Sequence, residues 1–368
     1  MVFGGINAWS RDYWVYVGPY TRAESKGIYV GRFNPESGQI SPWELAAETP
    51  SPSFLAVDPQ HRFLYAVNEV RTFQDQPGGG VSAFAMDAGT GKLAPLNTVS
   101  SKGSGPCHLS VDAKGKWVLA ANYGSGSIAS FPIGPDGKLG QAASFVQHEG
   151  TSVNPERQKG PHAHWIDFFP GGRFALTMDL GLDKLLVYRF DEAGGALTPN
   201  QPPSIAAKPG SGPRHFAFHP KGKFGYSIHE MGNILVAYSV DAAAGTLKEI
   251  QTLTTLPDGF QGKSFTAEIF VHPSGKFVYG SNRGHDSICS FAVDPKQGTL
   301  SPIETVSTEG QFPRSFAIDP TGNFMLVANQ NSNNMILFRI DPKTGRLRSL
   351  GAVAPLQAPV CVLFVPVK

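Results

Sequence analysis

Short apolar runs recur along the whole chain and are separated by Gly, Pro and Asp. Residues 54–58, 63–68 and 81–87 form three such runs, in which apolar side chains alternate with other residues or follow one another directly. Runs of this length, set off by turn residues, are typical of β-strands, and almost no stretch has the apolar spacing of a helix. The pattern therefore predicts an all-β protein.

Six tight turns of similar sequence divide the chain into repeated units. They lie about fifty residues apart, at 58–61, 112–115, 169–172, 219–222, 272–275 and 319–322. A strand with its turn takes roughly 8 to 12 residues, so each interval holds about four strands. Four-stranded units in tandem predict the blades of a β-propeller.

The two ends of the chain together predict a seventh blade. Residues 13–47 match the second, third and fourth strands of a unit, and residues 359–366 match the missing first strand. Pairing these segments would close the ring and remove its exposed edges, whereas an open solenoid would need capping repeats. We therefore expect one domain over residues 1–368, a seven-bladed β-propeller with four antiparallel strands per blade and ordered repeats from about 13 to 366.

Composition adds little to this picture but excludes several classes of protein. A net charge of +2, with 16% charged residues, argues against a nucleic-acid-binding surface. The cysteines, Cys107, Cys289 and Cys361, are too few and too scattered for a disulfide framework or a metal knuckle. Residues 1–14 lack the features of a secretory signal and no window is apolar enough to span a membrane, so we expect a cytoplasmic protein.

Repeat position predicts which residues share one end of the central channel. In a propeller blade the first strand lines the channel and the second returns beside it, so the start of one and the end of the other lie on the same face. That face would also carry the long loops at 71–80 and 148–163. The ring at the start of the first strands is Ser53, Cys107, His164, Arg214, Ala267, Arg314 and Val360, followed one step on by Phe54, His108, Trp165, His215, Glu268, Ser315 and Cys361. The second strands end at Glu69, Tyr123, Leu180, Glu230, Arg283 and Gln330.

These rings differ from blade to blade, unlike the uniform Asn, Asp and His residues that precede the strand-two ends, and we interpret the variable rings as a site. The residues expected to be catalytic are His164, Arg214, Glu230, Glu268 and Arg283. Those expected to bind substrate are His108, His162, His215, Asn282, Arg314, Gln330 and Glu69. A nucleophile–base pair of Cys107 and His108 is disfavoured because neighbouring side chains on a strand point to opposite faces. His162 and His164 have no third ligand fixed by spacing, so no metal is expected.

Short motifs in every blade resemble the lactonase family of seven-bladed β-propellers. They read Tyr-Val-Gly-Pro-Tyr-Thr at 16–21, Gly-Pro-Cys-His at 105–108, Arg-Gln at 157–158, Pro-His-Ala-His at 161–164, Gly-Pro-Arg-His at 212–215, Ala-Glu-Ile at 267–269, Ser-Asn-Arg-Gly at 281–284 and Ala-Asn-Gln at 328–330. The family includes bacterial propeller-type 6-phosphogluconolactonases and a fungal carboxy-cis,cis-muconate cyclase. By resemblance, the cyclase-type site of one His, two Arg and one Glu is implied at His164, Arg214, Arg283 and Glu230. Pro19 departs from the usual Gly-Thr-Tyr-Thr segment of the family, which is expected to change only the local shape of the mouth.

The resemblance implies a lactonase without metal or cofactor, which converts 6-phosphogluconolactone to 6-phosphogluconate in the pentose phosphate pathway. Arg214 and His164 would hold the carbonyl oxygen, while Glu230 or Glu268 takes a proton from water. Arg283, Arg314 and His108 would bind the phosphate. The expected partner is a small phosphorylated or carboxylated lactone, with no nucleic acid or membrane, and the protein is expected to be a monomer or a weak homo-oligomer.

Three alternatives stay open at this point. Cycloisomerisation of a carboxylated muconate would use the same arginines to clamp carboxylates. A non-enzymatic propeller that binds a protein would need apolar residues at its mouth. A calcium-dependent lactonase would need channel-facing ligands such as Asn122, Asp179, Asn282 and Asn329, whose regular repetition favours hydrogen bonds between blades instead.

Overall fold

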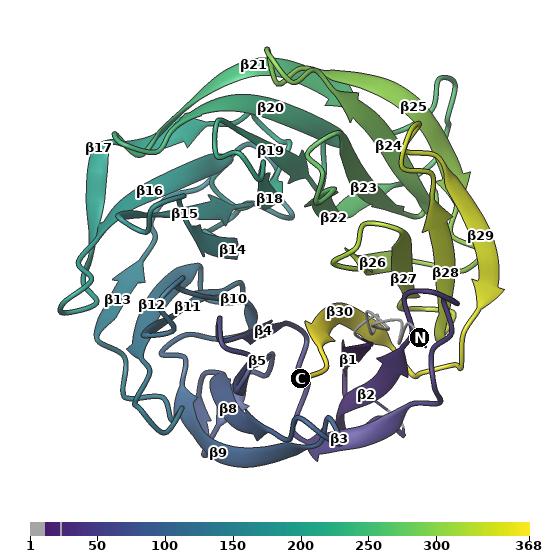
Figure 1. The fold of residues 1–368 in the computed structure, drawn as a ribbon. Helices are drawn as coiled ribbons and strands as arrows, with labels where there is room; N and C mark the ends of the chain where they lie inside the picture. Colours follow the sequence, from purple (N-terminus) through teal and green to yellow (C-terminus); the bar gives the residue numbers. More distant parts are fainter. Residues whose placement is uncertain (1–11, 23) are drawn as a thin grey trace, which may run out of the picture.

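Seven four-stranded antiparallel sheets stand in a ring around a central axis in the computed structural model (Figure 1). The structure describes residues 12–22 and 24–368, and every regular element in this part of the chain is a β-strand. The predicted seven-bladed propeller is therefore confirmed. The prediction that the N-terminus carries no secretory signal concerns mainly residues 1–11, which lie outside the described residues.

The strands occupy the same four places in each blade. The innermost strands are β4 (Leu55–Val57), β10 (Pro106–Val111), β14 (Ala163–Phe168), β18 (Pro213–Phe218), β22 (Phe265–Val271), β26 (Pro313–Ile318) and β30 (Pro359–Pro366). The second strands are β5 (Phe63–Asn68), β11 (Trp117–Asn122), β15 (Phe174–Asp179), β19 (Phe224–His229), β23 (Phe277–Arg283), β27 (Phe324–Asn329) and β1 (Tyr13–Pro19). The third strands are β8 (Gly80–Met86), β12 (Ser127–Pro132), β16 (Lys184–Phe190), β20 (Ile234–Asp241), β24 (Ser287–Val293), β28 (Asn334–Ile340) and β2 (Gly27–Phe33). The outer strands are β9 (Leu93–Ser100), β13 (Ser144–Gln147), β17 (Leu197–Ala206), β21 (Thr246–Thr254), β25 (Leu300–Ser307), β29 (Leu347–Ala352) and β3 (Glu44–Glu48).

Blade seven combines both ends of the chain, as the sequence predicted. Its strand order is β3-β2-β1-β30, and β30 runs antiparallel to β1 from the pair Tyr13 and Pro366 to the pair Gly18 and Cys361. Because the last strand hydrogen-bonds to the first, the ring closes without a free inner edge. A short extra hairpin, β6 (Thr72–Phe73) and β7 (Gln76–Pro77), lies within the loop after β5 and was not predicted.

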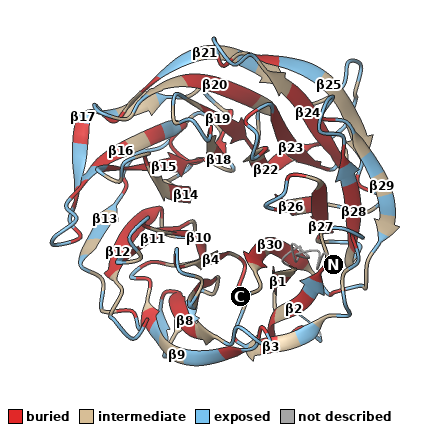
Figure 2. Cartoon of the chain, viewed as in Figure 1, coloured by how far each residue is buried: buried red, intermediate tan, exposed pale blue. Residues whose placement is uncertain are grey.

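The hydrophobic core is a series of layers between neighbouring blades. Inner and second strands are largely buried, whereas the outer strands are exposed along much of one face (Figure 2). In one layer Tyr65 of blade one packs with Val118 and Phe131 of blade two, and equivalent clusters follow around the ring. Each blade is thus stabilised by burying apolar area against both of its neighbours.

Turns between the third and fourth strands connect each blade to its neighbour. The backbone carbonyl of Gly137 in one such turn accepts a hydrogen bond of 3.1 Å from the hydroxyl of Tyr65 in the adjacent blade. The equivalent turn residue Gly195 has φ of 74°, and a Cβ atom there would lie 2.2 Å from the Trp117 ring. Only glycine fits a left-handed turn this close to an aromatic ring.

The uniform ring of Asn, Asp and His residues at the ends of the second strands is structural. Nδ2 of Asn122 donates to the carbonyl of Ser101, and Nδ2 of Asn282 donates to the carbonyl of Thr255, in each case in the connection from the preceding blade. Asn282 is fully buried and its side chain holds two blades together, while its expected role in substrate binding stays a prediction.

Candidate active site

A β-bulge interrupts the inner strand of most blades at the same ring position. The register shifts between Pro106 and His108 in β10, and the equivalent shifts leave His164, Arg214 and Arg314 without a partner in the ladder. A bulge places two residues opposite one and re-aims their side chains. In these blades the start of the inner strand therefore does not follow the strict alternation expected from the sequence.

The bulges change the surroundings of Cys107. Its Sγ lies 3.8 Å from Nδ1 of His164 on the next blade, whereas the ring of His108 packs against Phe54, with centroids 4.0 Å apart. Burial raises the pKa of the Cys107 thiol well above its usual range. A thiol with a raised pKa is a poor nucleophile, so the pair of Cys107 and His108 stays disfavoured, now for this reason rather than for side-chain alternation.

Three arginine side chains converge on one carboxylate at the mouth of the channel. Oε1 of Glu230 is 2.7 Å from Nη2 of Arg157. Oε2 of Glu230 is 3.2 Å from Nε of Arg214 and 2.7 Å from Nη2 of Arg283. Burial acts to raise the pKa of Glu230, but the Arg283, Arg214 and Arg157 guanidinium groups outweigh it and hold that pKa well below its usual range. Glu230 is therefore a carboxylate whose two oxygens are both occupied.

Backbone carbonyls of blade five hold two of these arginines in place. Nη1 of Arg214 donates to the carbonyl of Ala267 at 2.6 Å, and Nη2 of Arg283 donates to the carbonyl of Thr266 at 2.8 Å. Burial lowers the pKa of Arg214 to about 9, and the charges of Arg283 and Arg314 act in the same direction. The cluster therefore concentrates positive charge in a buried place and would attract an anionic group.

Arg157 is a site residue that reasoning from repeat positions did not identify. It lies in the loop from residue 148 to 163, where its backbone N–H donates to Oδ1 of Asn154 at 3.0 Å, and its side chain also donates to the hydroxyl of Tyr123 at 3.1 Å. This loop connects two blades and is longer than the connections between the other blades, so Arg157 has no equivalent position in the other repeats. The only signal was the Arg-Gln pair among the family-like motifs.

A second layer of site residues lies beneath the mouth, further along the axis. Nδ1 of His215 and Oε1 of Glu268 are 2.7 Å apart, and the ring of His215 lies near those of His108 and His164, with centroids 5.4 and 5.1 Å away. Burial, followed by the positive charge of Arg214, lowers the pKa of His164 and His215 well below its usual range. Burial raises the pKa of Glu268 to about 7. This layer contains neutral imidazoles and a carboxyl group that titrates near neutral pH.

The set predicted to be catalytic is therefore divided between two depths. Glu268 lines a cavity of about 440 Å³ together with Phe54, Trp165 and Phe218, and no arginine of the mouth lines it. His108 also lines this cavity, while His215 is buried beside Glu268. The expected roles of His108 and His215 in substrate binding stay predictions, and both residues are packed in the lower layer.

The remaining predicted residues lie around the mouth. His162 stacks on Tyr123 with ring centroids 4.5 Å apart. Glu69 accepts hydrogen bonds from the hydroxyls of Tyr20 and Ser53. Nε2 of Gln330 donates to the side chain of the neighbouring Asn331. The guanidinium of Arg314 lies 5.5 Å from the ring centroid of Tyr20.

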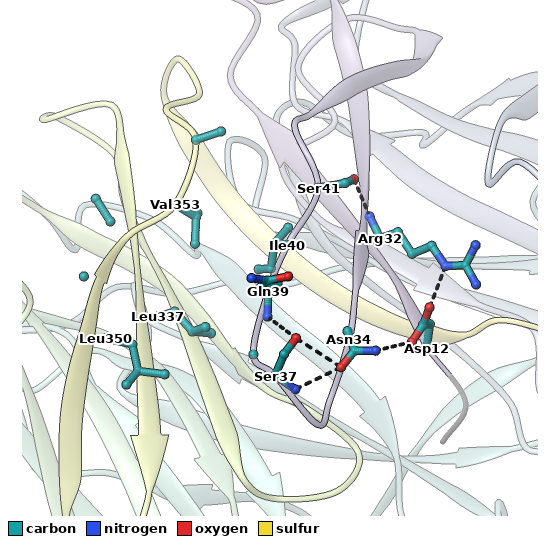
Figure 3. Close-up of a pocket in the computed structure, with 14 residues that line it drawn as sticks. Asp12, Arg32, Asn34, Ser37, Gln39, Ile40, Ser41, Leu337, Leu350 and Val353 are labelled. Atoms are coloured by element: carbon teal, nitrogen blue, oxygen red, sulfur yellow. Dashed lines mark hydrogen bonds and ion pairs between the residues drawn. The ribbon is translucent and has the colours of Figure 1, made fainter. Parts of the chain in front are cut away.

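A larger cavity of about 830 Å³ lies far from these residues, at the outer edge between blades six and seven (Figure 3). Its polar lining residues bond to one another: Arg32 pairs with Asp12 at 2.7 Å, and Asn34 accepts hydrogen bonds from Ser37. No residue of the arginine cluster contributes to it, so the mouth is the better candidate for an active site.

Among residues 12–22 and 24–368, no group of three or more His, Cys, Asp or Glu side chains is arranged to hold a metal ion. Within the same ranges, no helix is long and apolar enough to cross a membrane.

The closed ring and its mouth define the class of protein, a seven-bladed β-propeller with an arginine-rich site at one end of the channel. The chain belongs to the family described as Lactonase, 7-bladed beta-propeller, which matches residues 14–364. The resemblance seen in the motifs is thereby confirmed.

Individual relatives agree with this assignment. A protein of Bacillus subtilis named 6-phosphogluconolactonase is 40% identical over 301 residues, which are 82% of this chain and 83% of the relative. The crystal structure of a candidate 6-phosphogluconolactonase from Bacteroides fragilis is 37% identical, has a TM-score of 0.90, and the match covers 96% of this chain and 98% of that one. The structure of a periplasmic gluconolactonase from Pseudomonas aeruginosa is 34% identical, has a TM-score of 0.92, and the match covers 97% and 100%.

Proposed function

We propose that this protein is a lactonase that hydrolyses 6-phosphogluconolactone to 6-phosphogluconate. The observation that carries the proposal is the convergence of Arg157, Arg214 and Arg283 on Glu230 at the mouth of the channel. The family and the names of the similar proteins support the same reaction. A role in the pentose phosphate pathway, a cytoplasmic location, and a monomeric or weakly oligomeric state stay predictions.

Ring-opening of a lactone requires a polarised carbonyl, an activated water and stabilisation of the tetrahedral oxyanion. Arg214 would donate to the carbonyl oxygen and to the oxyanion that replaces it. His164, which is neutral because burial and Arg214 lower its pKa, would accept a proton from the water as the water oxygen bonds to the carbonyl carbon. When the intermediate collapses, the bond from that carbon to the ring oxygen breaks and His164 returns the proton to this oxygen.

We assign the role of general base at the mouth to neither Glu230 nor Glu268. Both oxygens of Glu230 accept bonds from guanidinium groups, so its role is to hold the three arginines together against their mutual repulsion. Glu268 lies in the lower layer against His215, where it fixes the orientation of that ring rather than meeting substrate at the mouth.

Proton release after addition of fresh lactone tests the proposal directly. We expect catalysed release with 6-phosphogluconolactone above the spontaneous rate, and the same rate after treatment with a chelator. A panel with a carboxylated muconate separates hydrolysis from cycloisomerisation. Turnover of the muconate without any catalysed lactone hydrolysis would overturn the proposal.

A further inference from the structure

Arg314 differs from the other arginines of the mouth because its guanidinium N–H groups have no partner. Arg157, Arg214 and Arg283 each bond to Glu230. Within residues 12–22 and 24–368, Arg314 makes no hydrogen bond or ion pair, and its side-chain contact is the cation–π interaction with Tyr20. A guanidinium has five N–H donors, so Arg314 has its donors available for a ligand.

Tyr20 fixes the position of Arg314 without using those donors. The hydroxyl of Tyr20 lies 3.0 and 3.1 Å from the two carboxylate oxygens of Glu69, and its backbone N–H donates to the carbonyl of Ala358 at 3.1 Å. Stacking against an aromatic face holds a guanidinium in place while leaving its edge available. Arg22 also stacks on Tyr20, at 4.9 Å, but it is exposed to water, which weakens its interaction with an anion.

Arg314 lies in a different blade from the groups proposed for the chemistry, although its positive charge still acts to lower the pKa of Arg214. It lies in blade six, whereas His164 and Arg214 lie in blades three and four, and the ring positions on either side of Arg314 are the uncharged Ala267 and Val360. A six-carbon lactone phosphorylated on C6 has its carbonyl carbon and its phosphate at opposite ends. Arg214 and Arg314, which lie in different blades around the mouth, offer a donor for each of these two ends.

The other residues predicted to bind phosphate are less suitable. Arg283 already bonds to Glu230 and to the carbonyl of Thr266. His108 lies in the lower layer, and burial lowers its pKa so that the ring is neutral. Arg283 also has donors left on Nη1, but Glu230 and the carbonyls of Phe265 and Thr266 already hold its guanidinium, whereas Arg314 makes no hydrogen bond or ion pair among the described residues.

We propose that Arg314, stacked on Tyr20, binds the phosphate of the lactone and sets the preference for phosphorylated over unphosphorylated substrates. The inference rests on the proposed lactonase activity and adds the residue that selects among lactones. It assigns the carbonyl end of the substrate to Arg214 and the phosphate end to Arg314.

Kinetics of Arg314→Gln with two lactones test the assignment. We expect kcat/KM for 6-phosphogluconolactone to fall by at least ~30-fold, because a charge-assisted contact to phosphate is lost. For unphosphorylated gluconolactone we expect a change of less than about two-fold. Arg71→Gln is the matched control, since Arg71 is an exposed arginine in a loop on the same face, and it should leave both values unchanged.

Product binding gives a second measurement that does not require turnover. Calorimetry should show wild-type protein binding 6-phosphogluconate more tightly than gluconate, and Arg314→Gln should lose this difference. Equal losses of kcat/KM with both lactones, or an unchanged preference for the phosphorylated ligand in Arg314→Gln, would overturn the role of Arg314. Failure of the lactonase proposal is recognised separately, because the wild-type protein would then hydrolyse neither lactone.

Discussion

Glu230 brings together three guanidinium groups that would otherwise repel one another. A buried carboxylate is costly unless it is paired and hydrogen-bonded, and here Arg157, Arg214 and Arg283 supply that compensation. In return the carboxylate keeps these arginines at fixed positions in a partly dry site. A preorganised set of donors stabilises a developing oxyanion without reorganising during the reaction.

Glu230→Gln tests this positioning role. The substitution keeps the size of the side chain but removes the charge, so we expect kcat/KM for the lactone to fall by at least ~100-fold as the arginines separate. Circular dichroism and thermal unfolding should accompany the kinetics, because an uncompensated buried cluster is expected to destabilise the fold by about 3–5 kcal/mol. A folded variant with wild-type kcat/KM would contradict the role.

Glu268 makes the stability of the protein depend on pH. Burial raises its pKa to about 7, above the value in an unfolded chain. Its contribution to stability is therefore complete below the unfolded pKa and is lost as the pH rises through about 7. His215 acts in the opposite sense, because its lowered pKa gives a contribution that is lost as the pH falls below the usual histidine range.

Denaturant unfolding of Glu268→Gln across the pH range separates these contributions. Glutamine cannot ionise, so the variant should lack the loss of on the order of 1–3 kcal/mol that Glu268 is expected to cause in the wild type between pH 5 and 8.5, while the pH dependence that comes from His215 should be present in both proteins. Glu36→Gln is the control, because Glu36 is exposed. Parallel pH curves for wild type and Glu268→Gln would show that Glu268 does not titrate near neutrality.

At the scale of the strand, the repeat was readable because three signals coincide. One four-stranded unit is specified by apolar runs with a period of two, such as residues 63–68, by tight turns, such as residues 58–61, and by the regular spacing of both. The bulges were not readable, because the residues they displace, Cys107, His164 and Arg214, share no chemical type.

The sequence also did not predict how deep along the channel each side chain lies. Equivalent positions predicted which residues face the axis, and Arg214, Glu230 and Arg283 do meet there. They did not predict that Glu268 would pair with His215 one layer below, since a bulge decides how far each side chain is displaced. Arg157 was missed because its loop is longer than the connections between the other blades, so the residue has no equivalent repeat position.

Gly195→Ala tests the connection between blades. A Cβ atom at this residue, with φ of 74°, would lie 2.2 Å from the Trp117 ring. Left-handed strain and overpacking together are expected to cost about 2–4 kcal/mol. The measurement is the midpoint of thermal unfolding, with Gly160→Ala as the control because a Cβ there meets nothing within 4 Å. Equal midpoints for the two variants would contradict this packing.

For the whole molecule, closure of the ring depends on one strand. β30 pairs with β1 over most of its length, and the backbone N–H of Val367 donates to the carbonyl of Asp12 at 2.9 Å. Without β30, the apolar edge of β1 and one side of the channel would be exposed to water. The ring would then behave as an open array with an unprotected edge.

Truncation after residue 356 tests this dependence. We expect the shortened chain to lose lactonase activity and to unfold at a lower temperature or aggregate. The control is a permuted chain in which residues 357–368 precede Asp12 through a short linker, which gives blade seven the same hairpin order as the other blades. Its unfolding midpoint should approach that of the wild type. A truncated chain with wild-type stability would show that closure does not contribute.

The hydrogen bond from Tyr20 to Ala358 has a consequence for synthesis in the cell. Tyr20 is among the first residues of the ring to leave the ribosome, but its backbone partner and the strand that follows are among the last. Blades one to six can pack in order as they emerge. The backbone N–H of Tyr20 has its partner, the carbonyl of Ala358, only when the end of the chain has been made. A nascent or prematurely terminated chain would therefore have its arginine cluster without the hydrogen bond from Tyr20 to Ala358, so the preference proposed for Arg314 would arise only after the last strand, β30, has been made.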